Sequence, residues 1–544
     1  MVPLDPVPSP IDHVLRGRAD DVALIDRDGV LTFAEAEAAV NAMAGWLAER
    51  GFAPGDRVAT WLPKTRAACL LPLAVPRAGL VHVPINPALR RAQVAHILAD
   101  SGARLLLTQT GRAETLEAGD VPANCEVVDE SECSRAGGSP VLRSDWAPAC
   151  AGAQTLAAIL YTSGSTGRPK GVMLSHANLW LGAVSVAHYL QLTPADRVLA
   201  VLPLSFDYGQ SQLFSTWYAG ASVAPLDYLT PRDVVKAVAR YGATTLAGVP
   251  PLWVQLLEAE WPAGTSLRRL TNSGGALTPR LVRGLRERFP AADIYAMYGL
   301  TEAFRSTFLE PALIGQHPDA IGRAIPFAEV MAVKPDDARA GAGEPGELVH
   351  AGPLVAQGYW RDPERTAQRF RPAPTWSASG GMAVWSGDTV VEGADGLFRF
   401  VGRDDEMIKS AGNRISPQEV EEAVLAGGEA REAVAIGVPD ARLGQAITVV
   451  LAGDPAREPK LRARLRAELP SFMQPGRYVW SDELPKNANG KLDRAAIRAQ
   501  LSPPPEGEGD RRAAVVEGLG QYSASPSDPR SARAPSPSGG GSGT

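Results

Sequence analysis

Cysteine and histidine are scarce in this sequence. The 544 residues include seven histidines and four cysteines, which are Cys69, Cys125, Cys133 and Cys150. The cysteines have neither the paired spacing of a zinc site nor the pattern of a disulfide framework. No two histidines have the spacing of metal ligands, and no convincing Ser-His-Asp or Cys-His set is present. We therefore expect reduced, structural thiols and no covalent catalysis by a side chain of the protein.

Long apolar runs are missing as well. The longest apolar stretch, residues 67–75, is interrupted by Pro72, and a membrane helix needs about 20 apolar residues. Met1 to Asp20 lacks the basic-then-apolar pattern of a signal peptide. The net charge of -6 argues against a nucleic-acid partner. These features, with 45% hydrophobic and 21% charged residues, predict a cytoplasmic enzyme without a membrane span.

Strand-like and helix-like segments alternate through most of the chain. Residues 31–49 repeat apolar side chains at helical spacing, and Gly51 follows where a helix stop is expected. Apolar runs typical of strands lie at residues 57–62, 104–108, 156–161, 197–202 and 244–249. This alternation predicts an α/β fold, in which a large N-terminal region has largely parallel sheets covered by helices.

The pattern changes twice along the chain. Between residues 322 and 400, short strand-like runs separated by glycine turns predict a β-rich subdomain. Residues 416–425 then predict a helix with Ser416 as N-cap and Pro417 at its first position, within a small mobile α+β domain. We predict domains at 1–402 and 403–501, followed by a disordered low-complexity tail at 502–544.

The sharpest local signal is a glycine- and hydroxyl-rich loop that follows the apolar run 156–160. Gly164 and Gly167 let its backbone turn tightly and bring N–H groups close to phosphate oxygens. Lys170 adds positive charge at its end. The hydroxyl donors are Thr162, Ser163, Ser165 and Thr166. Pro169 precedes the lysine, so the loop does not match the phosphate motif of common nucleotide hydrolases.

This loop resembles the signature of the adenylate-forming superfamily, which includes acyl-CoA synthetases, amino-acid adenylating domains and beetle-type luciferases. Further motifs match in the family's order from about residue 31 to 501. The run after Glu302 also resembles a ligase subgroup associated with exosortase gene clusters. The resemblance implies ATP and Mg²⁺ as cofactors, with coenzyme A or a phosphopantetheine thiol as acceptor.

By this resemblance, two motifs hold the nucleotide. The adenine-contacting turn comprises Gly274, Gly275 and Ala276. In the second motif, Tyr298 stacks on adenine, Thr301 bonds the α-phosphate and Glu302 holds Mg²⁺, a hard cation that prefers carboxylate oxygen.

Three later motifs complete the resemblance. Asp388 binds the ribose hydroxyls, and its carboxylate acceptor suits a vicinal diol. Arg403 contacts ribose or phosphate, and Asp405 is the hinge of the small domain. Lys491 bridges the substrate carboxylate and the α-phosphate, although Lys486 lies in the same loop.

The implied reaction has two steps. The substrate carboxylate attacks the α-phosphorus of ATP, while Lys170, Thr301, Glu302 and Lys491 balance charge. The small domain then rotates about Asp405, and the thiol attacks the acyl-adenylate so that AMP leaves.

The acid itself remains open. Phe206 stands where many acyl-CoA ligases have a histidine, whereas Asp207 resembles the aspartate that binds the α-ammonium in amino-acid adenylating domains. Gly275 would also contact the substrate, and Trp253, Phe304 and Arg305 would shape the pocket. Asp207 could instead cap the helix that follows it.

Two alternatives to an acyl-CoA synthetase stay open. One is an enzyme that adenylates an amino or imino acid for a carrier protein, and since no carrier domain follows Leu501, we expect a separate acceptor molecule. The other is a catalytically silent nucleotide-binding scaffold. Such a protein is expected to have lost Glu302 or Lys491, and both are present.

Overall fold

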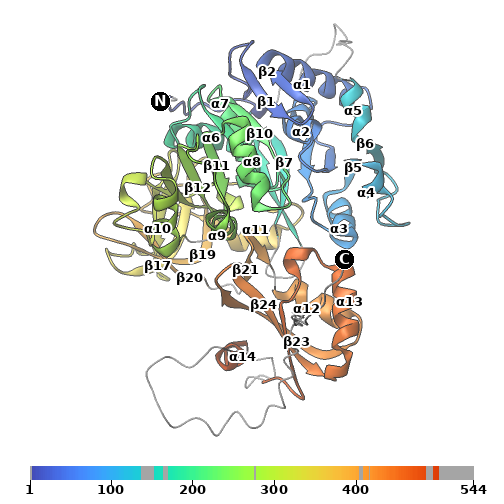
Figure 1. The fold of residues 1–544 in the computed structure, drawn as a ribbon, viewed down its shortest axis with the longest axis vertical. Helices are drawn as coiled ribbons and strands as arrows, with labels where there is room; N and C mark the ends of the chain where they lie inside the picture. The colour runs from blue at the N-terminus through green and yellow to red at the C-terminus, as the bar shows by residue number, and fades with distance from the viewer. Residues whose placement is uncertain are drawn as a thin grey trace, which may run out of the picture.

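The computed structural model describes residues 3–136, 152–162, 169–274, 277, 279–403, 408–415, 417–485 and 494–501. The large N-terminal region occupies the upper part of Figure 1, and a smaller α+β region, from residue 408 onward, lies below it. The predicted α/β fold class is confirmed. The predicted boundary near residue 402 stays a prediction.

A six-stranded sheet forms one layer of the large region. Its strand order is β6-β5-β3-β4-β7-β8, and all neighbours are parallel except the β7–β8 pair. The strands are β3 (Arg57–Trp61), β4 (Val81–Pro84), β5 (Ala103–Thr108), β6 (Glu126–Asp129), β7 (Leu156–Thr162) and β8 (Lys170–Ser175). The helices between them are α2 (Arg66–Arg77), α3 (Arg91–Ser101), α4 (Thr110–Ala113) and α5 (Glu130–Ala136).

A second, 14-stranded sheet changes character along its length. Its first part contains the parallel strands β1 (Val22–Asp26), β10 (Ser222–Pro225), β9 (Arg197–Ala200), β11 (Thr245–Gly248), β12 (Arg269–Asn272) and β13 (Asp293–Tyr298), with β2 (Gly29–Thr32) antiparallel at the edge. Antiparallel strands continue it: β14 (Thr307–Leu309), β15 (Ala320–Ala324), β20 (Phe398–Arg403), β19 (Met382–Glu392), β17 (Pro345–Ala351), β16 (Glu329–Val333) and β18 (Phe370–Pro372). The predicted β-rich subdomain is therefore the antiparallel continuation of a parallel sheet.

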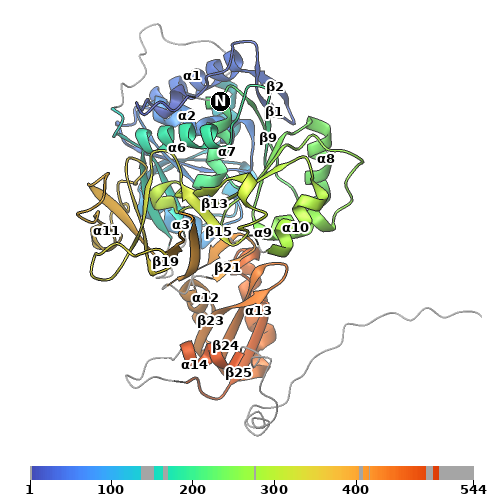
Figure 2. The same ribbon diagram turned by 90° about the vertical axis from the view of Figure 1, so that its left-hand side faces the viewer.

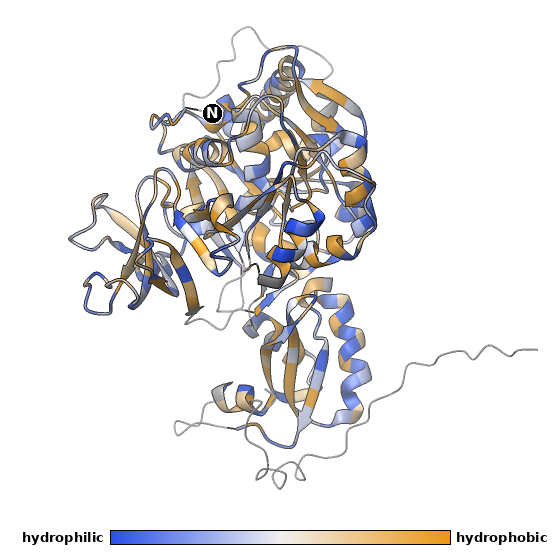
Figure 3. Cartoon of the chain, turned by 60° about the vertical axis from the view of Figure 1, so that its left-hand side comes forward, coloured by the Kyte–Doolittle hydropathy of each residue, from blue (hydrophilic) through white to orange (hydrophobic). Residues whose placement is uncertain are grey.

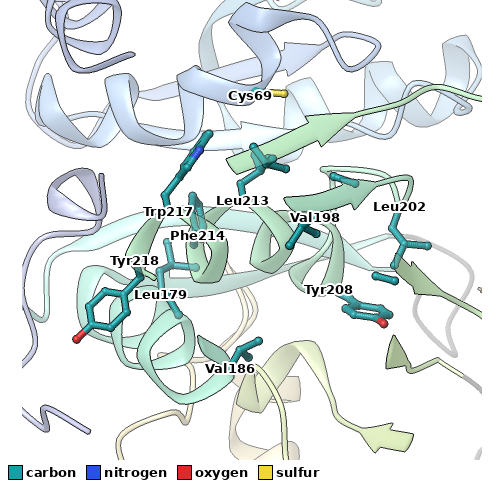
Figure 4. Close-up of a cluster of buried hydrophobic side chains, with 14 of the residues drawn as sticks. Cys69, Leu179, Val186, Val198, Leu202, Tyr208, Leu213, Phe214, Trp217 and Tyr218 are labelled. Atoms are coloured by element: carbon teal, nitrogen blue, oxygen red, sulfur yellow. The ribbon is translucent and has the colours of Figure 1, made fainter. Parts of the chain in front are cut away.

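Two buried helices occupy the centre of the large region. Helices α6 (His176–Tyr189) and α7 (Asp207–Tyr218) bury nearly every residue, because they are covered on all sides. In Figure 4, Leu179 of α6 and Phe214 of α7 belong to one apolar cluster, and the Trp217 ring points toward the helix that carries Cys69. The Trp217 indole donates a hydrogen bond of 2.9 Å to the carbonyl of Ala23. The remaining helices of this region are α1 (Phe33–Ala48), α8 (Pro231–Tyr241), α9 (Pro250–Glu258), α10 (Pro279–Arg288) and α11 (Pro363–Arg369).

The small region has a hydrophobic core of its own. Its sheet has the order β22-β21-β24-β23, and β25 pairs with β24. The strands are β21 (Ile408–Ser410), β22 (Asn413–Ile415), β23 (Ala430–Asp440), β24 (Gly444–Gly453) and β25 (Arg477–Ser481), and the helices are α12 (Pro417–Ala426), α13 (Glu458–Glu468) and α14 (Arg494–Leu501). Its strands are mostly hydrophobic and α13 is mostly hydrophilic (Figure 3). Helix α14 lies at the end away from the large region (Figures 1 and 2).

The structure refines several sequence predictions. All five predicted strands of the parallel sheets are confirmed. The predicted helix at 31–49 begins later, at Phe33, because Leu31 and Thr32 belong to β2 and Thr32 forms a capping box with Glu35. Strand β8, between the phosphate loop and the helix after Ser175, was not predicted from the sequence. Within the described ranges, no helix is long and apolar enough to cross a membrane.

One glycine holds α7 close to the preceding chain. A Cβ added to Gly209 would lie 1.6 Å from the carbonyl oxygen of Pro203, so Gly209→Ala must displace backbone. We expect this substitution to lower the free energy of unfolding by about 3 kcal/mol. Gly45→Ala in α1 is the matched control, because a Cβ there meets nothing within 4 Å, and it should stabilise by about 0.5–1 kcal/mol. Urea denaturation measures both, and equal effects would contradict this packing.

Candidate active site

A large cavity lies where several parallel strands end. It has a volume of about 720 Å³, within the roughly 300–1,000 Å³ typical of small-molecule sites. Its walls include Thr162 at the end of β7, Asp207 after β9, Val249 after β11, Gly274 after β12 and Thr301 after β13. Chain segments diverge at the carboxyl ends of parallel strands, which leaves room for a ligand there.

The small region contributes to the same cavity. The lining residues from this region are Ala411, Gly412, Asn413, Ile415, Glu419, Phe472 and Met473. Gly412 has a φ of +78°, and a Cβ there would lie 2.7 Å from Val249 Cγ2. A side chain at this position would collide with the cavity wall, so glycine allows the close approach of the two regions.

Glu302 is the centre of a compact polar cluster in this cavity. Its side chain comes from the short 3-10 helix η2 (Thr301–Ala303) and is almost completely buried. Lys170 Nζ lies 3.0 Å from Glu302 Oε1, and the Tyr359 hydroxyl donates to the same oxygen at 2.7 Å. Lys170 Nζ also donates to the Tyr359 hydroxyl at 2.6 Å. Lys170, Glu302 and Tyr359 are far apart in the sequence, yet each of their side chains contacts the other two.

The surroundings of Glu302 keep its carboxyl ionised. Burial opposes the charged form, but the nearby cations Lys170 and Arg369 and the hydroxyl of Tyr359 outweigh it. Together they lower the pKa of Glu302 well below its ordinary value. A carboxylate that is charged at neutral pH can bind a hard cation such as Mg²⁺. Within the described ranges, no group of three or more His, Cys, Asp or Glu could hold a metal ion.

A second polar pair lies on the antiparallel side of the cavity. The Tyr298 hydroxyl, at the end of β13, donates a short hydrogen bond to Asp388 on β19. Asp388 is buried and opposes Arg403 in the register of β19 and β20. The two sequence motifs predicted to contact adenine and ribose are therefore adjacent in space.

Several predicted residues lie outside the described ranges. In the phosphate loop these are Ser163, Gly164, Ser165, Thr166 and Gly167, and elsewhere they are Gly275, Ala276, Asp405, Lys486 and Lys491, together with the side chain of Arg403. The residues at the two ends of the loop are described. Thr162 lines the cavity, and its buried hydroxyl has no hydrogen-bond partner among the described residues. Lys170 lines the cavity as well.

Asp207 lines the cavity but already has two partners. Thr301 Oγ1 donates to its Oδ1 at 3.3 Å, and Arg305 Nη2 lies 3.7 Å from its Oδ2. Burial raises the pKa of Asp207, and the charge of Arg305 opposes that rise. The residue at the N-cap of α7 is Phe206, with Asp207 as the first helical residue, so the capping alternative is wrong by one position. Phe206 also lines the cavity.

Two residues of this site were not predicted from the sequence, and three predicted residues do not belong to the described lining. Tyr359 and Arg369 both line the cavity and act on Glu302. The run of aromatic and charged residues at 358–365 was the available signal for Tyr359. Trp253, Phe304 and Arg305, which were predicted to shape the pocket, are fully buried and do not belong to the described lining.

Comparison with protein families gives two matches. Residues 11–360 match the AMP-binding enzyme family, and residues 419–491 match the AMP-binding enzyme C-terminal domain. Tyrocidine synthase 3 of Brevibacillus parabrevis is 32% identical over 486 residues, which cover 88% of this chain and 7% of that protein. Phosphinothricin tripeptide synthetase PhsB of Streptomyces viridochromogenes is 31% identical over 506 residues, which cover 91% of this chain and 42% of that protein. The chain thus spans less than half of these relatives.

Solved structures of similar length share the fold. The o-succinylbenzoate CoA synthetase MenE of Bacillus subtilis superposes with a TM-score of 0.79 at 25% identity, covering 90% of this chain and 98% of that chain. The amide bond synthetase McbA of Marinactinospora thermotolerans has a TM-score of 0.78 at 26% identity, covering 91% of this chain and 100% of that chain. The chain belongs to the AMP-binding enzyme family and is an adenylate-forming enzyme.

Proposed function

We propose that this enzyme activates a carboxylic acid with ATP, releases pyrophosphate, and transfers the acyl group from the adenylate to a pantetheine thiol, as an acyl-CoA synthetase does. The observation that carries this proposal is the cluster of Lys170, Glu302 and Tyr359 in the cavity. It provides a cation, an ionised carboxylate and a hydroxyl, which suit a metal-bound triphosphate. The similarity to the CoA synthetase MenE supports the choice of acceptor.

The nucleotide would bind along the polar side of the cavity. The Asp388 carboxylate, an acceptor without donors of its own, would accept from the ribose hydroxyls. Thr301 and Lys170 line the cavity near Glu302 and would donate to the phosphates. Arg403, Gly274, Gly275 and Ala276 keep their predicted roles at the ribose, phosphate and adenine.

Glu302 would hold Mg²⁺, with Lys170 shifting toward the phosphates when the nucleotide enters. The ion would neutralise part of the phosphate charge. Because its pKa is low, Glu302 stays ionised over the physiological pH range. Lys170 and Arg369 would balance the remaining negative charge, which favours attack by the substrate carboxylate on the α-phosphorus.

The second step requires the small domain to change orientation. Helix α14 begins three residues after Lys491 and packs against β23, where Arg494 Nη1 donates to the carbonyl of Ala435 at 3.4 Å. Arg494 Nη2 also lies 2.6 Å from Glu421 Oε2 on α12. Helix α14 lies at the end of the small region away from the large region (Figure 2). We propose that the described arrangement corresponds to thioester formation, and that rotation about Asp405 brings Lys491 to the cavity for adenylation.

An amino-acid adenylating enzyme that loads a carrier protein is the second candidate. Two observations favour it: Asp207 lines the cavity, and the relatives include a tripeptide synthetase. The Asp207–Arg305 pair argues against it, because Asp207 already faces a cation.

Loss of the Glu302 charge should weaken adenylation through the metal. Glu302→Gln keeps the shape but cannot neutralise Mg²⁺ or Lys170, so kcat should fall on the order of 100-fold and the Mg²⁺ requirement should rise. Pyrophosphate release measured against Mg²⁺ concentration checks this. Tyr359→Phe keeps the carboxylate and is the control, with a smaller loss and no change in the Mg²⁺ requirement. An unchanged requirement in the glutamine variant would remove Glu302 from the metal site.

Lys491 should matter for only one of the two steps. Lys491→Ala removes the predicted bridging ammonium, and we expect pyrophosphate release to fall on the order of 100-fold or more. Thioester formation from pre-made acyl-adenylate should change little. Lys486→Ala, in the same loop, is the matched control and should retain both activities. Equal losses of both steps in Lys491→Ala would contradict domain rotation.

A further inference from the structure

Arg305 is a buried cation directly behind the cavity wall. Its exposed fraction is 1%, and its guanidinium carbon lies 4.5 Å from the centroid of the Tyr208 ring. Its charged partner is Asp207, at 3.7 Å. The Nε atom has no hydrogen-bond partner among the described residues. A buried guanidinium is retained only when something compensates for its lost hydration, and here that compensation comes mainly from Asp207 and Tyr208.

A strained turn directs Arg305 to this place. Phe304 has φ and ψ of 58° and -68°, a region that a bulky residue rarely adopts, and the Arg305 N–H donates to the carbonyl of Ala303 at 2.6 Å. This is a three-residue γ-turn in its disfavoured form. A Cβ on Gly299 would lie 2.8 Å from Arg305 Cα and 3.2 Å from its Cδ. The turn and the glycine together fix the arginine beside Asp207.

The charge of Asp207 is therefore already balanced from within the protein. With Asp207 ionised, the pair carries no net charge, and Arg305 is enclosed by the core, so it cannot swing aside when a ligand enters. A substrate ammonium next to Asp207 would lose its hydration and also face Arg305, a like charge. The lining of the cavity includes the apolar and aromatic residues Val201, Leu202, Phe206, Tyr228 and Val249, together with the paired charges Lys64 and Asp227.

We propose that Arg305 is a specificity-determining residue that neutralises Asp207, so that the enzyme activates carboxylic acids with an apolar or aromatic body and no amino group on carbon 2. This inference rests on the proposed adenylation and chooses between its two candidate substrate classes. Arg305 acts through Asp207 and does not itself contact the reacting carboxylate.

The test compares acids that differ only at carbon 2. ATP–pyrophosphate exchange is measured with 3-phenylpropionate and phenylalanine, 4-methylpentanoate and leucine, and butyrate and 2-aminobutyrate. The wild-type enzyme should prefer the amino-free member of each active pair by at least tenfold in kcat/KM. Arg305→Met leaves Asp207 without its cation, and it should shift this ratio at least tenfold toward the amino acid. A wild-type preference for amino acids, or an unchanged ratio in the variant, would overturn the proposal.

Two further variants separate specificity from stability. Arg77 is also a buried arginine, 3% exposed and 3.1 Å from Asp12, and it does not belong to the described lining of the cavity. Arg77→Met should lower the melting temperature without changing the ratio. Adding Asp207→Asn to Arg305→Met should restore part of the melting temperature and abolish the gain with amino acids.

The outcomes distinguish this inference from the proposed function. If no acid of the panel supports exchange, the adenylation proposal fails and the substrate assignment fails with it. If exchange occurs but the ratios contradict the expectation, only the role of Arg305 fails. Should Arg305→Met not fold, the wild-type ratios still decide, because a preference for amino acids overturns the proposal.

Discussion

The ion pair between the partly buried Lys170 and the buried Glu302 joins the parts of the large region on which the site depends. Lys170 begins β8 of the six-stranded sheet, and Glu302 follows β13 of the 14-stranded sheet. Tyr359 lies in a segment that bonds to both: the Gln357 N–H donates to Met173 O at 2.9 Å, and the Ala356 N–H donates to Glu302 O at 2.9 Å. The Glu302 carboxylate therefore connects the two sheets through Lys170, and the Glu302 carbonyl binds the segment that carries Tyr359.

Burying the Glu302 carboxylate costs free energy, and the cations and donors that offset this cost lie in the cavity. A buried carboxylate is unfavourable unless cations and donors surround it, and breaking such a pair by removing one partner costs about 3–5 kcal/mol. Lys170 and Arg369 keep Glu302 charged in the absence of a nucleotide. In the proposed function, a metal-bound triphosphate would bring positive and negative charge together, so that Glu302 would pair with the metal and Lys170 with the phosphates, and no buried charge would be left uncompensated.

The sequence predicts much of this structure because its strongest signals are local. Apolar runs such as 156–161 and 197–202 identify parallel strands, and the predicted residues Thr162 and Asp207 follow these two runs and line the cavity. Long-range contacts left no comparable signal. Strand β8 begins at Lys170, which the sequence analysis assigned to the end of the glycine-rich loop. The Tyr359 hydroxyl bonds to Glu302, which is 57 residues away in the sequence. The Asp207–Arg305 pair depends on a turn in which Phe304 has a positive φ. Bulky aromatic residues rarely adopt a positive φ, so the sequence does not predict this turn.

The central claim is that a substrate carboxylate attacks the α-phosphorus of ATP in this cavity. The most direct measurement uses an acid whose carboxylate carries ¹⁸O, with ATP, Mg²⁺ and coenzyme A, followed by mass spectrometry of the nucleotide product. Attack by the carboxylate leaves one of its oxygens on phosphorus when the thiol displaces AMP, so the account predicts AMP with one ¹⁸O atom. Unlabelled AMP, or ADP as the product, would contradict it.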